Sequence, residues 1–305
     1  MDAPQYGSAK FSASRLISKA GLRAILILSA GPAFGANEDD GAVNSSIPSV
    51  YLDLRTIYAQ VPAGSLAFGF GRPTLFNALQ PLATLNRAAF PAGLPAAKSL
   101  NVDFPLTVDV TDSVSLYAGI SGSSTDFGGT GFSSFQITSW NVGFQADLYQ
   151  QDGGSFPTLT LQSTITQSIP NGPLTTTSFN NILEFDYAFD SDETRGFLAG
   201  FQRTRTDVGH ALVRIKPNTI AYVGGYYQWS NNWKLTGRVG AQSFQGAQLL
   251  SLASVQPFTQ PIVRLDLDRV DDNDDRLFGV TVEIMWVPKP AYQLTLRTPL
   301  YAVRN

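Results

Sequence analysis

The sequence predicts an all-β fold, an antiparallel transmembrane β-barrel of about 12 strands with a range of about 10–14. Three observations predict it. Apolar and polar residues alternate in segment after segment, the connections between these segments alternate in length, and charged residues make up only 15% of the 305-residue chain. Soluble domains carry roughly 25% charged residues. A mean hydropathy close to zero argues against a bundle of transmembrane helices.

Residues 1–35 have the pattern of a secretory signal peptide. Four positive charges precede or flank the short apolar run Ala24–Ala30, and Ala33 and Gly35 are small residues that suit cleavage after Gly35. The run is shorter than the roughly 18 residues of a membrane-spanning helix. A buried N-terminal helix is the alternative. We therefore expect an exported chain whose mature part, 36–305, is a single barrel domain.

Strand signals continue along the whole mature chain. Apolar residues from Leu100 to Val110 occupy one face of their segment, and Asn101, Asp103 and Asp109 occupy the other, as the two-residue period of a strand requires. The strands expected on this basis, with bounds uncertain by about 2–4 residues, are 50–59, 65–70, 99–110, 114–121, 134–148, 157–167, 178–189, 195–206, 218–229, 233–244, 276–287 and 291–303, with 262–270 as a candidate extra strand.

Short and long connections alternate between these strands. Short turns at one rim and long loops at the other are typical of outer-membrane barrels, and only a closed barrel leaves no unpaired strand edge in lipid. The expected count, however, puts both termini on the long-loop side, so either a strand is miscounted near 245–275 or at the N-terminus, or the orientation differs. The short connections are 61–64, 111–113, 190–194, 230–232 and 288–290; the long ones are 71–98, 122–133, 168–177, 207–217 and 245–275.

Segment 71–98 differs from its surroundings. It holds four prolines, and its leucines are spaced by three and four residues, which predicts a short amphipathic helix or a folded loop. Such a segment either enters the lumen or caps the mouth of the barrel, and a mobile surface loop is equally consistent with the pattern.

Aromatic residues lie near the ends of several expected strands. This placement predicts girdles at the two lipid–water boundaries of a barrel, and the alternative is the core of a soluble β-protein. The residues of the expected girdle are Trp140, Trp229, Trp233, Trp286 and Tyr292.

Charged residues fall on the polar parity of the expected strands. Because Arg or Lys on the lipid face costs about 2–4 kcal/mol near the membrane midplane, these side chains are expected to face the lumen. The residues expected to line a pore are Asp103, Asp109, Glu184, Asp186, Lys234, Arg238, Glu283 and Arg297. A lumen with both signs of charge suits either an aqueous path or a plug of ion pairs.

Two units, Phe104–Gly119 and Tyr226–Gly237, resemble strand–turn–strand hairpins of Gram-negative outer-membrane barrels, in the porin-like and aromatic-pathway group. The resemblance covers the texture of residues 50–303 and includes no substrate signature. It implies a location in the cell outer membrane, with outer-membrane lipid, a small-molecule solute and the barrel assembly machinery as partners. The chain departs from the group's pattern because it ends in Asn305 and has no terminal aromatic residue.

Little in the chain suggests catalysis. There are no cysteines and a single histidine, His210, which lies near Asp207 in an expected loop. No enzyme activity, cofactor or metal is expected, because one histidine leaves only carboxylates to complete a zinc site. The acidic run Asp271–Asp275, with Asp266 and Asp268 upstream, has oxygen ligands for Ca²⁺, but a solvated turn is favoured. Mild acidity and the absence of a basic patch argue against nucleic acid.

The sequence therefore favours an outer-membrane channel for passive passage of small solutes, hydrophobic or aromatic ones included, through a narrow barrel. Two alternatives stay open. One is a closed structural or binding barrel that acts through its loops, and the other is a barrel hydrolase that uses His210. The identity of the solute and the oligomeric state do not follow from the sequence.

Overall fold

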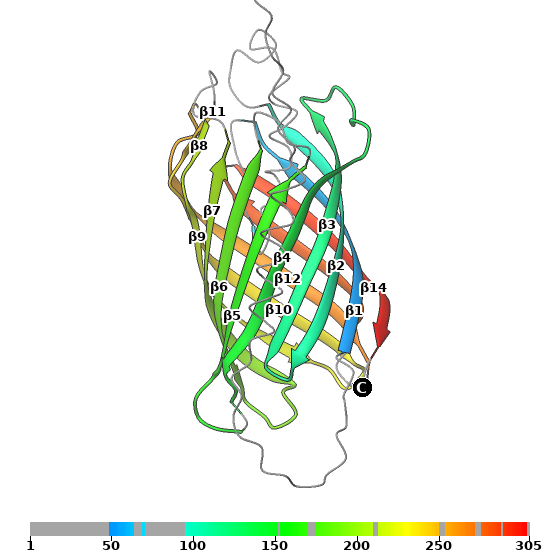
Figure 1. The fold of residues 1–305 in the computed structure, drawn as a ribbon. Helices are drawn as coiled ribbons and strands as arrows, with labels where there is room; N and C mark the ends of the chain where they lie inside the picture. The colour runs from blue at the N-terminus through cyan, green and yellow to red at the C-terminus, as the bar shows by residue number, and fades with distance from the viewer. Residues whose placement is uncertain are drawn as a thin grey trace, which may run out of the picture. The chain divides into compact units, whose positions relative to one another are not determined.

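A computed structural model describes residues 49–63, 69–70, 95–151, 153–169, 175–209, 213–249, 254–271, 276–287 and 289–303. Antiparallel strands make up nearly all of this part of the chain (Figure 1). The barrel strands are β1 (Ser49–Val61), β2 (Ala97–Thr111), β3 (Val114–Phe127), β4 (Gln136–Tyr149), β5 (Thr158–Ser168), β6 (Thr176–Ala188), β7 (Arg195–Val208), β9 (Asn218–Gln228), β10 (Trp233–Phe244), β12 (Phe258–Val270), β13 (Arg276–Trp286) and β14 (Pro290–Val303). Two short strands, β8 (Val213–Ile215) and β11 (Ala247–Leu249), form a separate two-stranded sheet.

The twelve long strands close on themselves. Each of these strands pairs with the one before it and the one after it along the chain. The first strand, β1, pairs with both β2 and the last strand, β14. Tyr58 illustrates the closure, because its backbone is opposite Leu100 on one side and Leu294 on the other. The prediction of an all-β antiparallel barrel of about twelve strands is confirmed. In the described ranges, no helix is long and apolar enough to cross a membrane.

One strand was placed wrongly by the sequence pattern. Gly69 and Phe70, the described part of the expected strand 65–70, are not in a strand, whereas β12 at 258–270 extends the candidate strand 262–270 into a full member of the barrel. The total therefore stays at twelve. The alternation of inward and outward residues in β12 is hard to recognise from the sequence. Its inward positions carry charged residues, and the partners of these residues lie on nearby strands.

Because β12 replaces the expected strand 65–70, both termini of the barrel lie at the short-turn end and not at the long-loop end. The short-turn rim, at the bottom of Figure 1, holds the start of β1, the end of β14 and the connections 112–113, 150–157, 189–194, 229–232 and 271–275. The long-loop rim, at the top, holds the remaining connections together with β8 and β11. The termini thus lie with the short turns, as is usual in bacterial barrels. The turn 287–289 is an exception, since it is short and lies at the long-loop rim.

The two faces of the barrel have opposite polarity. Phe104 and Leu106 of β2 are 38% and 39% exposed on the outside, whereas Asn101 and Asp103 are 1% and 6% exposed on the inside. Thr107, on the inner parity, lines the central cavity. An apolar outer face and a polar interior are the reverse of a soluble barrel.

Tyrosine side chains lie against glycines of neighbouring strands on the inner face. The ring of Tyr222 covers Gly200, and that of Tyr226 covers Gly196, so closely that a Cβ atom at either glycine would meet the ring. Tyr117 covers Gly143 in the same way, and its hydroxyl donates to the carbonyl of Ser163 at 2.9 Å. These glycines are required because a ring can lie flat on the sheet only where the side chain beneath it is missing.

The turn between β6 and β7 is fixed by its own side chains. Asp190 accepts hydrogen bonds from the hydroxyl of Thr194 at 2.6 Å and from its N–H at 2.8 Å. The hydroxyl hydrogen bond holds the pKa of the Asp190 carboxyl below its usual value. Glu193 adopts φ 49°, a left-handed conformation that turns the chain into β7.

Candidate functional site: a charged lumen

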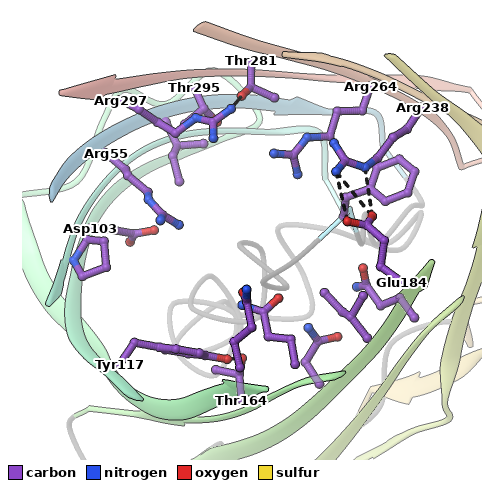
Figure 2. A pocket seen from close by; sticks show the side chains of 18 of the residues that line it. Arg55, Asp103, Tyr117, Thr164, Glu184, Arg238, Arg264, Thr281, Thr295 and Arg297 are labelled. Atoms are coloured by element: carbon purple, nitrogen blue, oxygen red, sulfur yellow. Dashed lines mark hydrogen bonds and ion pairs between the residues drawn. The ribbon is translucent and has the colours of Figure 1, made fainter. Parts of the chain in front are cut away.

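The barrel encloses a central cavity of about 470 Å³. Four arginines from four strands line it: Arg55 of β1, Arg238 of β10, Arg264 of β12 and Arg297 of β14. Figure 2 shows these arginines along one side of the space and Tyr117 and Thr164 on the opposite side. The opposite side also carries the neutral side chains Gln145, Gln162 and Asn180. The cavity therefore has a cationic side and a side of hydroxyls and amides.

Asp266 binds three of these arginines. Its carboxylate accepts hydrogen bonds from Arg264 Nε at 2.8 Å and Nη2 at 2.9 Å, and from Arg238 Nη1 at 3.2 Å. Arg297 Nη2 and the hydroxyl of Thr281 complete the set, the latter at 2.6 Å. Asp266 is only 3% exposed. One buried carboxylate thus fixes guanidinium groups from β10, β12 and β14 in a single network.

Glu184 connects this network to the other side of the barrel. From β6, it accepts from Arg238 Nη2 at 3.3 Å and Nε at 3.4 Å, and from the hydroxyl of Tyr222 at 2.6 Å. The guanidinium of Arg238 also lies 6.0 Å from the centre of the Tyr222 ring. Because Tyr222 is held over Gly200, the glycine indirectly positions Glu184.

Asp268 extends the network toward the short-turn rim. It accepts from Arg276 Nε at 2.9 Å and lies 3.8 Å from Arg297 Nη2. Asp266 and Asp268 are therefore partners of arginines, which corrects the idea that they join a cation site with the acidic run downstream. Asp272–Asp275 lie outside the described residues. Within the described ranges, no cluster of acidic or histidine side chains has an arrangement that would hold a metal ion.

The peptide Gly69–Phe70 lies inside the barrel, bonded to the inner face. The N–H of Phe70 donates to Glu283 Oε1 at 3.1 Å, and Gln202 Nε2 donates to the carbonyl of Gly69 at 3.1 Å. The Phe70 ring packs edge-on against Tyr222, with ring centroids 5.0 Å apart. A Cβ atom on Gly69 would overlap the Glu283 carboxylate, so this close approach requires glycine.

An apolar cluster surrounds Phe70 on the inner face. Its members include Leu198, Ile220, Ile262 and Met285, which are 0–3% exposed. The sequence analysis placed Gly69 and Phe70 at the end of an expected strand, 65–70, and missed this contact. The available signal was the run of apolar residues at inward positions of β9, β12 and β13. Of the expected lumen segment 71–98, only 95–98 is described, and Ala97 already begins β2.

The expected pore residues all lie on the inner parity of their strands, at different depths. Asp103, Glu184, Arg238 and Arg297 line the central cavity, whereas Glu283 is fully buried behind Phe70. Asp186 lines a second cavity, Asp109 accepts from the hydroxyl of Ser115 at 2.6 Å, and Lys234 lies 4.7 Å from the Tyr226 ring centre. Their role in a pore stays a prediction.

Three important lumen residues were missed. Arg264 and Asp266 lie on β12, which was not recognised as a full strand. Arg55 lies in an expected strand, but it gains meaning only from the register that places it opposite Asp103 on β2 and Arg297 on β14. Strand register is a long-range property, so no local pattern in the sequence contains it.

A second cavity of about 300 Å³ lies toward the short-turn rim. Asp147, Asp186 and Glu193 line it, and it shares Gln145, Gln162, Ile182 and Glu184 with the central cavity. The two cavities are therefore adjoining parts of one lumen.

The aromatic residues expected in the girdles lie near both rims. Trp229, 42% exposed, and Trp233 flank the turn at the short-turn rim. Trp286 ends β13 and Tyr292, 49% exposed, begins β14 at the long-loop rim. Trp140 lies on the outer parity of β4, in its half nearer the long-loop rim. Contact with a lipid boundary stays a prediction.

The suggested partner of the single histidine has another contact. Asp207 pairs with Arg205 Nε at 3.0 Å near the long-loop rim. His210 itself lies outside the described residues. The described part of the chain thus adds no support to a hydrolase based on His210.

Comparison with known proteins finds likeness in structure alone. The chain is similar to an outer membrane channel from Pseudomonas putida F1, with 10% identity, 88% of this chain and 99% of that chain covered, and a TM-score of 0.49. It is similar to the translocator domain of the autotransporter NalP from Neisseria meningitidis (9% identity, 93% and 96% covered, TM-score 0.41). It is also similar to a mutant of the TodX monoaromatic hydrocarbon channel (12% identity, 85% and 90% covered, TM-score 0.36).

No protein-family model and no curated protein matches the sequence. The closed barrel with its apolar outer face confirms the resemblance to outer-membrane barrels for the fold alone. At these identities, the solute and the mechanism have to be inferred from the lumen of this chain.

Proposed function

We propose that this protein is an outer-membrane channel that lets small solutes pass through a narrow polar lumen. The observation that carries the proposal is a central cavity of about 470 Å³, lined by charged and polar side chains, inside a closed barrel with an apolar exterior. A barrel of this polarity suits lipid outside and water inside.

The outer membrane is the environment that fits this exterior. Large apolar side chains, among them Phe144, Val223 and Leu265, are exposed around the barrel. Monomeric soluble proteins rarely expose a continuous apolar surface of this extent, whereas a membrane barrel needs one. A chain exported by a signal peptide and spanning with strands is expected in the outer membrane.

The lining favours hydrophilic solutes over the hydrophobic or aromatic ones that the sequence analysis included. Each of the four arginines in the central cavity would hold water or a polar group of a solute. A purely apolar solute would remove water from guanidinium and carboxylate groups without replacing the lost hydrogen bonds, which is unfavourable. Of the described apolar cluster around Phe70, Phe70 and Tyr222 line this cavity, and the other members do not.

A closed barrel is the second candidate, and two observations favour it. Phe70 lines the central cavity, and the ion pairs of Asp266 and Glu184 cross between strands at the same level. If the inserted peptide and these pairs fill the lumen, the protein would act through its loops.

Conductance in a planar lipid bilayer distinguishes the two candidates. We expect discrete current steps in KCl from the folded protein, and none from the same preparation after boiling. Folded protein can be recognised because intact barrels migrate differently from boiled ones in detergent gels. Folded protein that inserts and carries no current would identify the closed barrel. Recovery of the mature chain as a soluble periplasmic monomer would refute both candidates.

A further inference from the structure

We propose that the lumen selects small zwitterionic solutes, which carry a carboxylate and an ammonium group on one short skeleton. The inference rests on the proposed channel function and adds a solute class to it. It depends on the arrangement of charge in the two adjoining cavities.

The described lining of the central cavity holds more arginines than carboxylates, and Asp53, 3.8 Å from Arg55, offsets part of this charge. Arg55, Arg238, Arg264 and Arg297 line the cavity, with Asp103 and Glu184 as the only carboxylates of the described lining. Asp266 lies behind this lining and reduces the positive field without removing the guanidinium groups. The cavity is therefore moderately attractive to anions.

One hydrogen-bond donor at this site is unused among the described residues. Arg297 is 8% exposed, and its Nε has no hydrogen-bond partner among the described residues. A buried guanidinium N–H without an acceptor is unfavourable, and a solute carboxylate is a strong acceptor for it. Arg55, with a side chain 33% exposed, is the more accessible of the arginines named here and faces the same cavity.

The second cavity has the opposite charge. Its lining holds Asp147, Glu184, Asp186 and Glu193, and no arginine or lysine among the described residues. One oxygen of Asp186, Oδ1, is buried and has no hydrogen-bond partner in the described part of the chain. This cavity is attractive to an ammonium group.

The two zones adjoin along the lumen. Glu184 belongs to both cavities, and Asp186 is two residues further along β6 toward the short-turn rim. Two residues of a strand correspond to about 7 Å. Arg238 bonds Glu184, whereas Arg55 and Arg297 lie on strands five and six places from β6 around the barrel. A short amino acid therefore meets the arginines and Asp186 one after the other, with its carboxylate toward the arginines and its ammonium group toward Asp186.

Ions of one sign are repelled in one of the two zones. An anion is attracted to the arginines and repelled by the acidic cavity, and a cation experiences the reverse. In a narrow lumen, charges act at an effective dielectric constant below that of water, so each repulsion is a barrier to passage. A zwitterion meets attraction in both zones.

Current block with solutes of one skeleton tests this inference. The probes are 4-aminobutanoate, butanoate and butylammonium, added to the folded full-length mature protein in a bilayer in about 0.1 M KCl, where charges separated by more than about 10 Å are screened. We expect 4-aminobutanoate to halve the KCl current at a concentration about fivefold lower than either ion, the effect of one weak ion pair.

Two variants assign the effect to the two zones. Arg55→Gln should weaken block by 4-aminobutanoate and butanoate and leave that by butylammonium unchanged or stronger. Asp186→Asn should weaken block by 4-aminobutanoate and butylammonium. The matched controls are Arg205→Gln and Asp207→Asn, which alter an exposed pair near the long-loop rim and should change none of the three values. If Arg55→Gln does not fold, Arg55→Met, which removes the same charge and keeps a side chain of similar length, provides the same test.

Other outcomes overturn the inference or separate it from the proposed function. Equal block by butanoate would mean a simple anion site, and strongest block by butylammonium would mean a cation-binding entrance. Current without block by any probe would reject the inference and leave the channel intact. If no current is seen, binding of the three probes to the folded protein is measured by calorimetry. Preferential binding of 4-aminobutanoate would support the site and reject the channel. Absence of binding would reject the site.

Discussion

Asp266 holds Arg264 through both carboxylate oxygens, at 2.8 Å to Nε and 2.9 Å to Nη2. The same carboxylate also serves Arg238 and Arg297, so its loss would leave three guanidinium groups without their common acceptor. The relationship is the structural basis of the cationic side of the lumen.

Asp266→Asn is therefore expected to be strongly destabilising. Removing one partner of a buried ion pair costs about 3–5 kcal/mol, and residual water in the lumen would reduce that figure. The measurement is the urea midpoint for loss of the folded band in detergent gels. Asp207→Asn, in a pair with side chains 66% and 53% exposed, is the control, with an expected effect below about 1 kcal/mol. Equal midpoints for both variants would contradict the network described here.

Arginine substitutions on β2 test which face meets lipid. Phe104 is exposed on the outside and Thr107 lines the central cavity. Phe104→Arg should impair folding into lipid vesicles by about 2–4 kcal/mol if its depth is near the midplane, and Thr107→Arg should fold. The fraction folded is measured from gel migration. Similar yields for both variants would show that this outer face does not contact lipid.

The four tryptophans offer a measurement of depth. They lie near the two rims, on or next to the outer face of the barrel: Trp140, Trp229, Trp233 and Trp286. In variants that keep one tryptophan and replace the others with phenylalanine, lipids brominated near the headgroup should quench fluorescence more than lipids brominated near the chain end. A tryptophan introduced by Thr107→Trp, on the inner face, should be quenched by neither. Strong quenching from the chain ends would place the tryptophans at the midplane and reject the girdles.

A methyl group at Gly200 should disturb the lumen from the sheet beneath it. Ala at this position collides with the ring of Tyr222, which then loses its 2.6 Å hydrogen bond to Glu184. We expect Gly200→Ala to lower the free energy of unfolding by about 1–3 kcal/mol, the usual effect of overpacking. Gly237→Ala is a suitable control, because its Cβ would meet only Leu265 at an ordinary 3.5 Å. Comparable urea midpoints would mean that the Tyr222 ring can move without cost.

Phe70→Ala tests whether the inserted peptide narrows the path. Phe70 lines the central cavity and packs against Tyr222, so its truncation should increase single-channel conductance in KCl. Phe156→Ala, at a ring that is 50% exposed at the short-turn rim, should leave conductance unchanged. An unchanged conductance in Phe70→Ala would show that ions pass without meeting this ring.

The class of fold and the two faces of the strands were accessible from the sequence. A strand repeats every two residues, so the outward position of Phe104 and the inward position of Thr107 follow from local alternation. The same reasoning placed Asp103 and Glu184 inside. These inferences need no knowledge of neighbouring strands.

Features that depend on distant parts of the chain were not accessible. Arg264 and Asp266 were not predicted to line the lumen, because the other arginines that share Asp266 come from β10 and β14. The position of Phe70 inside the barrel depends on hydrogen bonds of the Gly69–Phe70 peptide to Glu283 and Gln202, which are remote in sequence. The positions of buried charges and of an inserted peptide depend on residues that are distant in the sequence. The alternation of polar and apolar residues along one strand contains no information about those residues.

The join between β1 and β14 has a kinetic consequence. Val50 pairs with Val303, so the first and last strands of the described barrel depend on each other for half of their backbone hydrogen bonds. This pair has the largest sequence separation of the strand pairs in the described barrel, and contacts between residues far apart in sequence form slowly. Until the last strand arrives, β1 has an open edge that can pair with another chain. The described barrel has no open strand edge only after β1 and β14 have paired, so we expect this pairing to be a late step of folding.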